Sequence, residues 1–394
     1  MRRLDEFDKQ SLLANRAPAW TERATMLFFS TPAARKMQGH AMNLYFSETQ
    51  LAHKPTQFMM HGRIVAPFET PERASALATA LAGIGMTSLT PRDDGGEAIL
   101  AVHADHYVRF LETACQRFSA LSPRGPEVWP NVHPYRGAGA DLAQRPAPRA
   151  TGIIGQAGWY MGDMACATME GTFAAAYASA QAAINGADDI VDGAPASFAL
   201  CRPPGHHAYS DRASGFCFLN NAAIAAERLR KRFSRVAIID FDTHHGDGTQ
   251  AIFYRRSDIF YGSVHTDPSA YYPYFAGYGD EHGEGDGAGF TLNLPLAPGA
   301  DDGAFAAANQ ALAQAVKAFG AEALVISAGW DAHGEDPLSK LKVTTAGFAQ
   351  IGTIWGSLRL PAVIVQEGGY SLVASAAAAP AFLTAFMRSA GLQR

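Results

Sequence analysis

The stretch that most restricts the fold is RVAIIDFDTHHGDGTQ at residues 235–250, where an apolar run gives way abruptly to carboxylates and imidazoles. Residues 236–239 are apolar throughout, which is typical of a strand buried on both faces. If the chain stays extended beyond them, the two-residue period places Asp240, Asp242 and His244 on the same side. Carboxylates and imidazoles are zinc ligands, and open α/β sheets carry their sites at the carboxyl ends of strands. We therefore predict a metal site here, against the alternative of a strand-to-helix turn with solvated Asp and His.

Strand-like and helical segments alternate along the rest of the chain. The expected strands are residues 42–46, 198–201, 236–240, 259–264, 324–327 and 362–366. The expected helices are residues 71–84, 104–118, 158–184, 220–232, 303–319 and 345–358. Repetition of strand, helix and strand implies right-handed crossovers. The pattern predicts an α/β fold in a single domain, with a mostly parallel central sheet and helices on both faces.

Three further polar clusters directly follow predicted strands. RPPGHHA places His206 and His207 on a turn stiffened by prolines, where two imidazoles can acquire different pKa values. AGWDAHGEDP supplies Asp331 as a third metal ligand, and EGGY supplies Tyr370, whose hydroxyl can stabilise an oxyanion. Three protein ligands with an open position describe a catalytic zinc. The four clusters together predict a site that hydrolyses a carbonyl compound.

A two-metal site is the main alternative chemistry. Two-manganese ureohydrolases resemble this layout, but their strand-end motif is Asp-x-His-x-Asp, followed later by Asp-x-Asp. Here Gly246 replaces one of these carboxylates and His333 replaces another. Both departures favour a single metal, and they leave His333 as the residue that could still add a ligand.

Composition argues against several other classes of protein. The formal net charge is −5 and charged residues are 18% of the chain, so no basic surplus for nucleic acid is present. The four cysteines lie far apart without a C-x-x-C pair, which favours reduced thiols and a cytoplasmic location. Apolar runs are strand-sized or belong to alanine-rich helices, so we expect neither a membrane span nor a secretory signal.

Two segments stand outside the alternating pattern. Residues 1–40 are expected to form an N-terminal extension, such as an oligomerisation arm, before a catalytic domain at residues 41–394. Residues 119–156 contain six prolines, with Trp129 and Tyr135 among them. A loop of this length within a compact domain is usually functional or disordered, and the aromatic residues favour function.

Five stretches of the sequence resemble one known group of enzymes. The arginase/deacetylase superfamily, and most closely its bacterial acetylpolyamine amidohydrolases and histone-deacetylase-like amidohydrolases, has motifs similar to FALCRPPGHHA, SGFCFLNNAAIAAERL, AIIDFDTHHGDGTQAIFY, HTDPSAYYPYFAGY and VIVQEGGY. These motifs recur in order along residues 42–390. The resemblance implies the arginase/deacetylase fold and a zinc-dependent hydrolase of linear amide bonds.

The resemblance also implies two kinds of metal site. Asp242, His244 and Asp331 match the zinc ligands of the family. A structural monovalent cation, usually K⁺, would lie beside the zinc and use Asp240, Asp242, His244 and Ser263, through backbone carbonyls as well as side chains.

The catalytic residues that the resemblance implies are His206, His207, Asp240, Asp247 and Tyr370. Zinc and Tyr370 would polarise the amide carbonyl, while His207 acts as general base on the attacking water and then protonates the departing amine. His206 would mainly orient and stabilise charge. Asp240 is the expected partner of His206 and Asp247 that of His207, although some relatives carry Asn in place of Asp247.

The expected substrate is a small N-acetylated amine such as an acetylpolyamine. Phe216 and Tyr272 match aromatic residues that wall a narrow channel in the family. Glu127 matches one acidic channel position, whereas Gln57 and Ile154 replace others. The alternatives are an acyl-lysine, another small amide including a xenobiotic one, and, in a different class, a binding protein without turnover.

The loop at residues 119–156 also carries an expectation about assembly. In the polyamine enzymes a similar loop reaches across a dimer interface and narrows the channel. The resemblance therefore implies a homodimer or homotetramer with a small-molecule amide as substrate. From the charge balance and the short apolar runs we expect no nucleic-acid or membrane partner.

Overall fold

The computed structural model describes residues 42–134 and 145–392. Its main sheet consists of β1 (Asn43–Tyr45), β4 (Ser88–Leu89), β5 (Ala196–Ala199), β6 (Val236–Asp240), β7 (Ile259–Thr266), β8 (Thr291–Leu296), β9 (Ala323–Ala328) and β10 (Ala362–Gln366). The strand order is β4-β1-β5-β10-β9-β6-β7-β8, and all neighbouring pairs are parallel. A separate antiparallel hairpin pairs β2 (Phe58–Met60) with β3 (Arg63–Val65). The predicted α/β class with a mostly parallel sheet is confirmed.

The end of β6 lies beside residues of both neighbouring strands. Asp240, the last residue of β6, pairs with Ser263 of β7 on one side and with Ser327 of β9 on the other. All residues of β5, β6, β7, β9 and β10 are buried, as expected for parallel strands covered on both faces. The polar residues that follow these strands therefore gather at one edge of the sheet.

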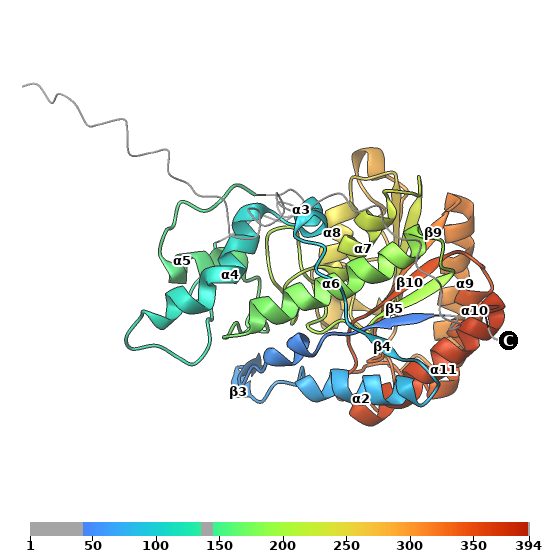
Figure 1. The fold of residues 1–394 in the computed structure, drawn as a ribbon, viewed down its shortest axis with the longest axis horizontal. Helices are drawn as coiled ribbons and strands as arrows, with labels where there is room; N and C mark the ends of the chain where they lie inside the picture. Colours follow the sequence, from blue (N-terminus) through green and yellow to red (C-terminus); the bar gives the residue numbers. More distant parts are fainter. Residues whose placement is uncertain (1–41, 135–144, 393–394) are drawn as a thin grey trace, which may run out of the picture.

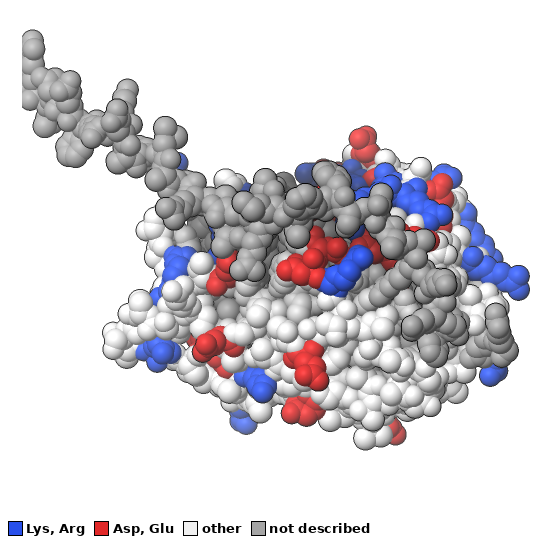
Figure 2. Space-filling view, in the orientation of Figure 1, with Lys and Arg blue, Asp and Glu red and all other residues white. Residues whose placement is uncertain are grey.

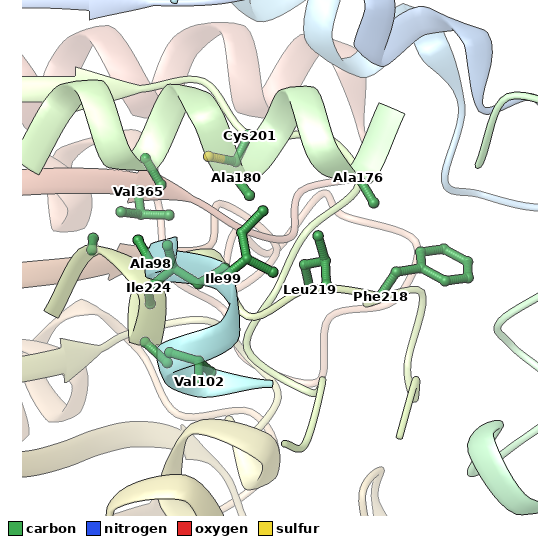
Figure 3. Packing of buried hydrophobic residues seen from close by; sticks show 14 of the residues in the cluster. Ala98, Ile99, Val102, Ala176, Ala180, Cys201, Phe218, Leu219, Ile224 and Val365 are labelled. Atoms are coloured by element: carbon green, nitrogen blue, oxygen red, sulfur yellow. The ribbon is translucent and has the colours of Figure 1, made fainter. Parts of the chain in front are cut away.

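Helices cover both faces of the sheet (Figure 1). They are α2 (Pro71–Ala82), α3 (Glu97–Val102), α4 (Asp105–Ser119), α5 (Ile153–Tyr160), α6 (Thr172–Val191), α7 (Asn221–Leu229), α8 (Asp247–Phe253), α9 (Asp302–Phe319), α10 (Thr345–Gly356) and α11 (Leu372–Ala390). Buried residues of α3 to α7 pack with Val236 and Ile238 of β6 in a first core, part of which Figure 3 shows. Those of α2, α9, α10 and α11 pack with Ala237 and Ile239 in a second core. Alternate side chains of one strand thus face opposite helical layers.

Helix α11 is the one helix among the described residues that is long and apolar enough to cross a membrane. Its residues Phe382, Leu383 and Phe386 are buried in the second core, and the helix packs against α10 and α2. This packing accounts for the apolar composition of α11 in the manner of a core helix.

The helix expected at residues 158–184 is wrong as a continuous element. The structure has α5 and α6 instead, separated by residues 161–171. In this interval Met161 bridges to Ala213 and Thr168 bridges to Val128. Gly171 then adopts φ +90°, which a right-handed helix does not accommodate, so α6 begins after it. The alanine-rich composition of α6 and the apolar residues of α5 concealed it.

The proline-rich loop is shorter than expected, and several elements were not predicted, namely β2, β3, β4, β8, α3, α8 and α11. Helix α4 ends at Ser119 and α5 begins at Ile153, so the connection comprises residues 120–152, of which 135–144 lie outside the described residues. Strand β8 at the sheet edge contains Pro295, an imino acid tolerated there because an edge strand has one unpaired side.

The predicted N-terminal extension, residues 1–40, lies outside the described residues. On the described part of the face shown in Figure 2, Lys and Arg side chains are interspersed with Asp and Glu. This mixed surface agrees with the small formal net charge of −5.

Candidate active site

Asp242, His244 and Asp331 form a buried cluster just beyond the ends of β6 and β9. Their ligand atoms all lie within 4.8 Å of one another. His244 Nδ1 is 3.0 Å from Asp242 Oδ1 and 3.2 Å from Asp331 Oδ2. The strand ends at Asp240, so a loop brings these residues together, where the sequence led us to expect an extended continuation of the strand. The three predicted zinc ligands nevertheless converge.

The electrostatics of this cluster fit a bound cation. Asp331 Oδ2 is buried, and among the described residues its polar contact is the ion pair with His244 Nδ1. Burial, together with the Asp242 carboxylate, raises the pKa of Asp331 to about 7. Burial opposes charge on His244, but hydrogen bonds to the two carboxylates outweigh it and raise the pKa of His244 to about 9. Two carboxylates and one imidazole that compete for protons in this way are a donor set suited to zinc.

Tyr271 determines which nitrogen of His244 faces the cluster. The two rings stack with centroids 4.9 Å apart. The Tyr271 hydroxyl donates its single hydrogen to the Leu338 carbonyl, so it accepts from His244 Nε2, 2.8 Å away. When His244 is neutral, the tautomer assigned by this network has its proton on Nε2, so that Nδ1 would offer its lone pair to a cation in place of the proton it shares with Asp242 and Asp331. Residues that hydrogen-bond to the second nitrogen of a metal-binding histidine orient its ring in this way. Sequence reasoning did not single out Tyr271.

His206 and His207 occupy the turn after β5 and have different carboxylate partners. His206 Nδ1 is 3.0 Å from Asp240 Oδ2, and His207 Nδ1 is 2.7 Å from Asp247 Oδ1. Burial disfavours charge on His206, but the carboxylates of Asp242 and Asp240 outweigh it and raise its pKa well above the usual value. Burial and the charge on His206 lower the pKa of His207. His206 is thus held protonated beside a neutral His207, the unequal pair that the sequence suggested.

Tyr370 lies on the loop after β10, close to the cluster of Asp242, His244 and Asp331. Its backbone N–H donates to Asp336 Oδ2 at 2.6 Å, and the Arg73 guanidinium lies 4.6 Å from the centroid of its ring. Burial raises the pKa of Tyr370 well above the usual value, despite the nearby charge of Arg73. The hydroxyl therefore stays protonated and can donate a hydrogen bond to an oxyanion.

Two buried charged residues that the sequence did not single out hold these loops. Arg73 of α2 donates to the carbonyls of Gly369 and Glu367, at 2.5 and 2.7 Å. The Glu367 carboxylate accepts from the backbone N–H groups of Gly205 and His206, at 2.6 and 3.1 Å. Arg73 thus fixes the loop that carries Tyr370, and Glu367 fixes the turn that carries the histidine pair. A carboxylate placed directly after a buried strand was a signal for Glu367, whereas Arg73 lies far away in sequence and offered none.

Ser263 is brought beside Asp240 by the register of β6 and β7. His265 Nε2 donates to the Gly277 carbonyl at 2.8 Å, so His265 Nδ1 accepts from Ser263 Oγ, also at 2.8 Å. Lone pairs of Ser263 Oγ remain available to a cation. The potassium site at Asp240, Asp242, His244 and Ser263 stays a prediction.

The two predicted channel aromatics contact different catalytic candidates. Tyr272 meets His207 edge-on, with ring centroids 4.9 Å apart. Phe216 packs on Tyr370 at 5.8 Å and on Phe58 at 5.1 Å. Both rings therefore border the region in which an amide would meet the histidine pair and the tyrosine.

Glu127, the predicted acidic channel residue, is buried close to this wall. Its Oε1 accepts from the backbone N–H and the hydroxyl of Thr56, two residues before Phe58, at 2.5 and 2.8 Å. Its Oε2 has no hydrogen-bond partner among the described residues. Gln57 adjoins Thr56, whereas Ile154 belongs to α5 and packs against the first core.

His333 does not lie with the predicted zinc ligands, so the structure does not support a fourth ligand at this position. His333 Nε2 is 3.2 Å from Thr345 Oγ1, and its ring stacks on Phe348. Within the described ranges it is not among the residues grouped as potential metal ligands. A side chain at Gly246 would begin 2.5 Å from Asp240 Oδ2, so the second carboxylate of a two-metal motif has no space. Among the described residues His206, Cys217 and Glu367 also lie close enough together to hold a metal, but neither this group nor the Asp242, His244 and Asp331 cluster contains the extra carboxylates of the two-manganese motif.

The fold and the site define a metal-dependent hydrolase of amide bonds. Residues 67–386 match the histone deacetylase domain, and the chain accordingly belongs to this family, within the arginase/deacetylase superfamily. Members of the family are generally zinc-dependent deacetylases. The predicted superfamily and enzyme class are confirmed, and the alternative of a non-catalytic binding protein is not supported.

The particular proteins that the chain resembles are acetylpolyamine amidohydrolases. It is 44% identical over 345 residues to the acetylpolyamine amidohydrolase of Burkholderia pseudomallei, which covers 88% of this chain and 98% of that protein. It is 40% identical to the enzyme of the same name from Mycoplana ramosa, over 84% of this chain and 95% of that protein. A crystal structure of the acetylpolyamine aminohydrolase from Burkholderia pseudomallei matches with a TM-score of 0.84 at 43% identity, covering 88% of this chain and 99% of that one.

Proposed function

We propose that this enzyme removes the acetyl group from a small N-acetylated amine of the polyamine type, with one zinc ion held by Asp242, His244 and Asp331. The observation that carries the proposal is the unequal histidine pair beside the buried cluster of Asp242, His244 and Asp331. A neutral imidazole next to a cation site can take a proton from water, whereas a protonated one cannot.

The chain's own groups account for the movement of protons. A zinc ion bound there would polarise the acetyl carbonyl and make a water molecule more acidic. Asp247 accepts from His207 Nδ1–H, so His207 Nε2 is free to take the proton of the attacking water and to deliver it to the departing amine nitrogen. The Tyr370 hydroxyl donates to the developing oxyanion, and the charge on His206 adds electrostatic stabilisation. Glu367 and Arg73 keep these groups in place.

Glu127 supports a cationic substrate. A buried carboxylate oxygen without a partner is unfavourable unless a donor or a positive charge arrives with the ligand. An ammonium group that lies several methylenes from the acetamide would satisfy it. The relatives named as acetylpolyamine amidohydrolases agree with this choice over an acyl-lysine or an aryl amide.

The potassium ion, a homodimeric or homotetrameric assembly and a cytoplasmic location stay predictions. The geometry of Ser263 and Asp240 supports the first of them. Size-exclusion chromatography with light scattering tests the second.

A substrate panel tests the proposed function. Zinc-loaded enzyme is assayed for acetate release from N-acetylputrescine, an acetyl-lysine peptide, 4-nitroacetanilide and N-acetylbutylamine, which is a neutral analogue of the first. We expect the highest kcat/KM for N-acetylputrescine, and loss of activity with a chelator that zinc restores. Absence of turnover of every straight-chain acetamide contradicts the proposal.

Glu127→Gln tests the substrate assignment within this panel, because the amide oxygen can still accept from Thr56. The variant should raise KM for N-acetylputrescine about 10-fold or more, since a hydrogen bond to a charged group contributes about 1.5–3 kcal/mol. The kinetics with neutral N-acetylbutylamine should stay close to wild type. Equal effects on the two substrates would assign Glu127 a purely structural role.

A further inference from the structure

A single carboxylate oxygen joins the two aromatic walls of the channel. Asp163 lies between α5 and α6, in the segment where the sequence led us to expect a helix. Its Oδ2 accepts from the Tyr272 hydroxyl at 2.7 Å, from the Gly215 backbone N–H at 2.9 Å and from the Ser214 hydroxyl at 3.1 Å. The Ser214 and Tyr272 hydroxyl oxygens are themselves 2.9 Å apart. Asp163 therefore ties the wall that carries Phe216 to the wall that carries Tyr272.

The turn that Asp163 holds has an unfavourable backbone conformation. Gly215 has φ +52° and Phe216 has φ +68°, so two successive residues are left-handed. For a residue with a side chain such as Phe216, this costs on the order of 1 kcal/mol or more unless neighbouring contacts impose it. A Cβ at Gly215 would lie 2.4 Å from His207 Cδ2 and 2.9 Å from the Tyr272 hydroxyl. The turn thus lies directly against His207, and the bonds from Gly215 and Ser214 to Asp163 keep it there.

The position of both walls is thereby set relative to the catalytic groups. Tyr272 is edge-on to His207, and Phe216 contacts Tyr370. The Asp163 Oδ1 atom accepts from the Ala165 N–H at 2.9 Å, which fixes the carboxylate itself. A shift of Asp163 would move the two aromatic rings apart and leave His207 and Tyr370 with their own partners.

We propose that Asp163 is a positioning residue that sets the spacing of Phe216 and Tyr272 and so restricts the enzyme to amides whose amine carries an unbranched methylene chain. This role rests on the proposed function, because it concerns the channel through which the acetylated amine enters. Asp163 acts through the two walls and does not itself touch the reacting atoms. Its removal should therefore change which substrates are accepted more than it changes the chemistry.

The test compares kcat/KM for N-acetylputrescine with kcat/KM for N-acetylbenzylamine, which has a bulky ring next to the amide. Asp163→Ala should lower this selectivity ratio on the order of 10-fold. Tyr272→Phe keeps the ring but loses the bond to Asp163, and should lower the ratio in the same direction. Because both substitutions remove the hydrogen bond between the Tyr272 hydroxyl and Asp163, the selectivity ratio of the double variant should resemble that of Asp163→Ala alone.

The matched control is Asp93→Ala. Asp93 also accepts from a tyrosine hydroxyl and a backbone N–H, those of Tyr177 at 2.6 Å and Gly95 at 2.9 Å, and it contacts neither channel wall. The selectivity ratio of the Asp93→Ala variant should equal that of the wild type. If Asp163→Ala does not fold, Tyr272→Phe decides the question by itself.

Two results would overturn the inference in distinguishable ways. If the wild type hydrolyses N-acetylputrescine, but Asp163→Ala or Tyr272→Phe lowers the kcat/KM of both substrates equally, Asp163 has no part in selection. If the wild type hydrolyses neither substrate, the proposed function is wrong and the role of Asp163 falls with it.

Discussion

Replacing Tyr271 with Phe should weaken zinc binding while leaving the fold intact. The Tyr271 hydroxyl donates to the Leu338 carbonyl and accepts from His244 Nε2–H at 2.8 Å. In the Phe variant this buried N–H has no acceptor, and the ring of His244 loses the contact that keeps Nδ1 toward Asp242 and Asp331. The stacked ring itself is retained, so the packing changes little.

The size of the effect follows from this lost partner. Loss of an outer partner typically lowers metal affinity about 10- to 100-fold, which corresponds to about 1.4–2.7 kcal/mol. A buried donor left without an acceptor costs about 1–3 kcal/mol, so two independent arguments agree.

Competition with a chromophoric chelator on the metal-free protein measures the zinc dissociation constant directly. Tyr107→Phe is the matched control, because the Tyr107 hydroxyl is buried and donates to the Phe218 carbonyl at 2.6 Å without contacting a predicted metal ligand. The control should keep the affinity of the wild type. A Tyr271→Phe protein whose zinc affinity lies within about twofold of wild type would refute the tautomer argument.

Two further predictions concern stability. Glu367→Ala should lower the free energy of unfolding by about 1–3 kcal/mol for each of the Gly205 and His206 N–H groups left without an acceptor. Glu367→Gln should lower it much less, because the amide oxygen can still accept. An equal loss of stability in both variants, measured by chemical denaturation, would contradict this prediction. Burial lowers the pKa of His103 from 6.5 to about 4, so the unfolded chain binds a proton that the folded chain does not. The associated stability is fully present above pH 6.5 and is lost as the pH falls toward 4, by up to about 1.4 kcal/mol per pH unit. His103→Gln should flatten that dependence, and an unchanged slope in the variant would show that His103 does not cause it.

The sequence was sufficient to predict the site residues that directly follow the buried strands. Parallel strands bring their carboxyl ends to one edge, so the sequence alone predicts that Asp242, Asp331 and the histidine pair lie close together. The expectation about their local path was less accurate, because the chain turns away immediately after Asp240. The loop after β6 brings Asp242 and His244 to Asp331, and the two-residue period of an extended strand does not predict the path of such a loop.

The residues that sequence reasoning missed act through backbone groups or through distant segments. Arg73 binds carbonyls of a segment far away in the sequence, and Glu367 binds backbone N–H groups, so its place after a strand did not reveal its role. Asp163 and Tyr271 gain their roles from segments more than fifty and about twenty-five residues away, respectively. The break before α6 was hidden for a related reason, since the interval between α5 and α6 is held by bridges to Ala213 and Val128. Such long-range contacts are properties of the packed chain.

The most direct test of the central claim is to measure acetate release from N-acetylputrescine and zinc content on the same samples of wild type and His207→Ala. His207 lies outside the Asp242, His244 and Asp331 cluster, so its removal takes away the proton acceptor and leaves the metal donors in place. We predict that both proteins hold one zinc ion per chain and that His207→Ala loses turnover by a factor on the order of 100 or more. Near-normal hydrolysis by a zinc-loaded His207→Ala protein would contradict the account.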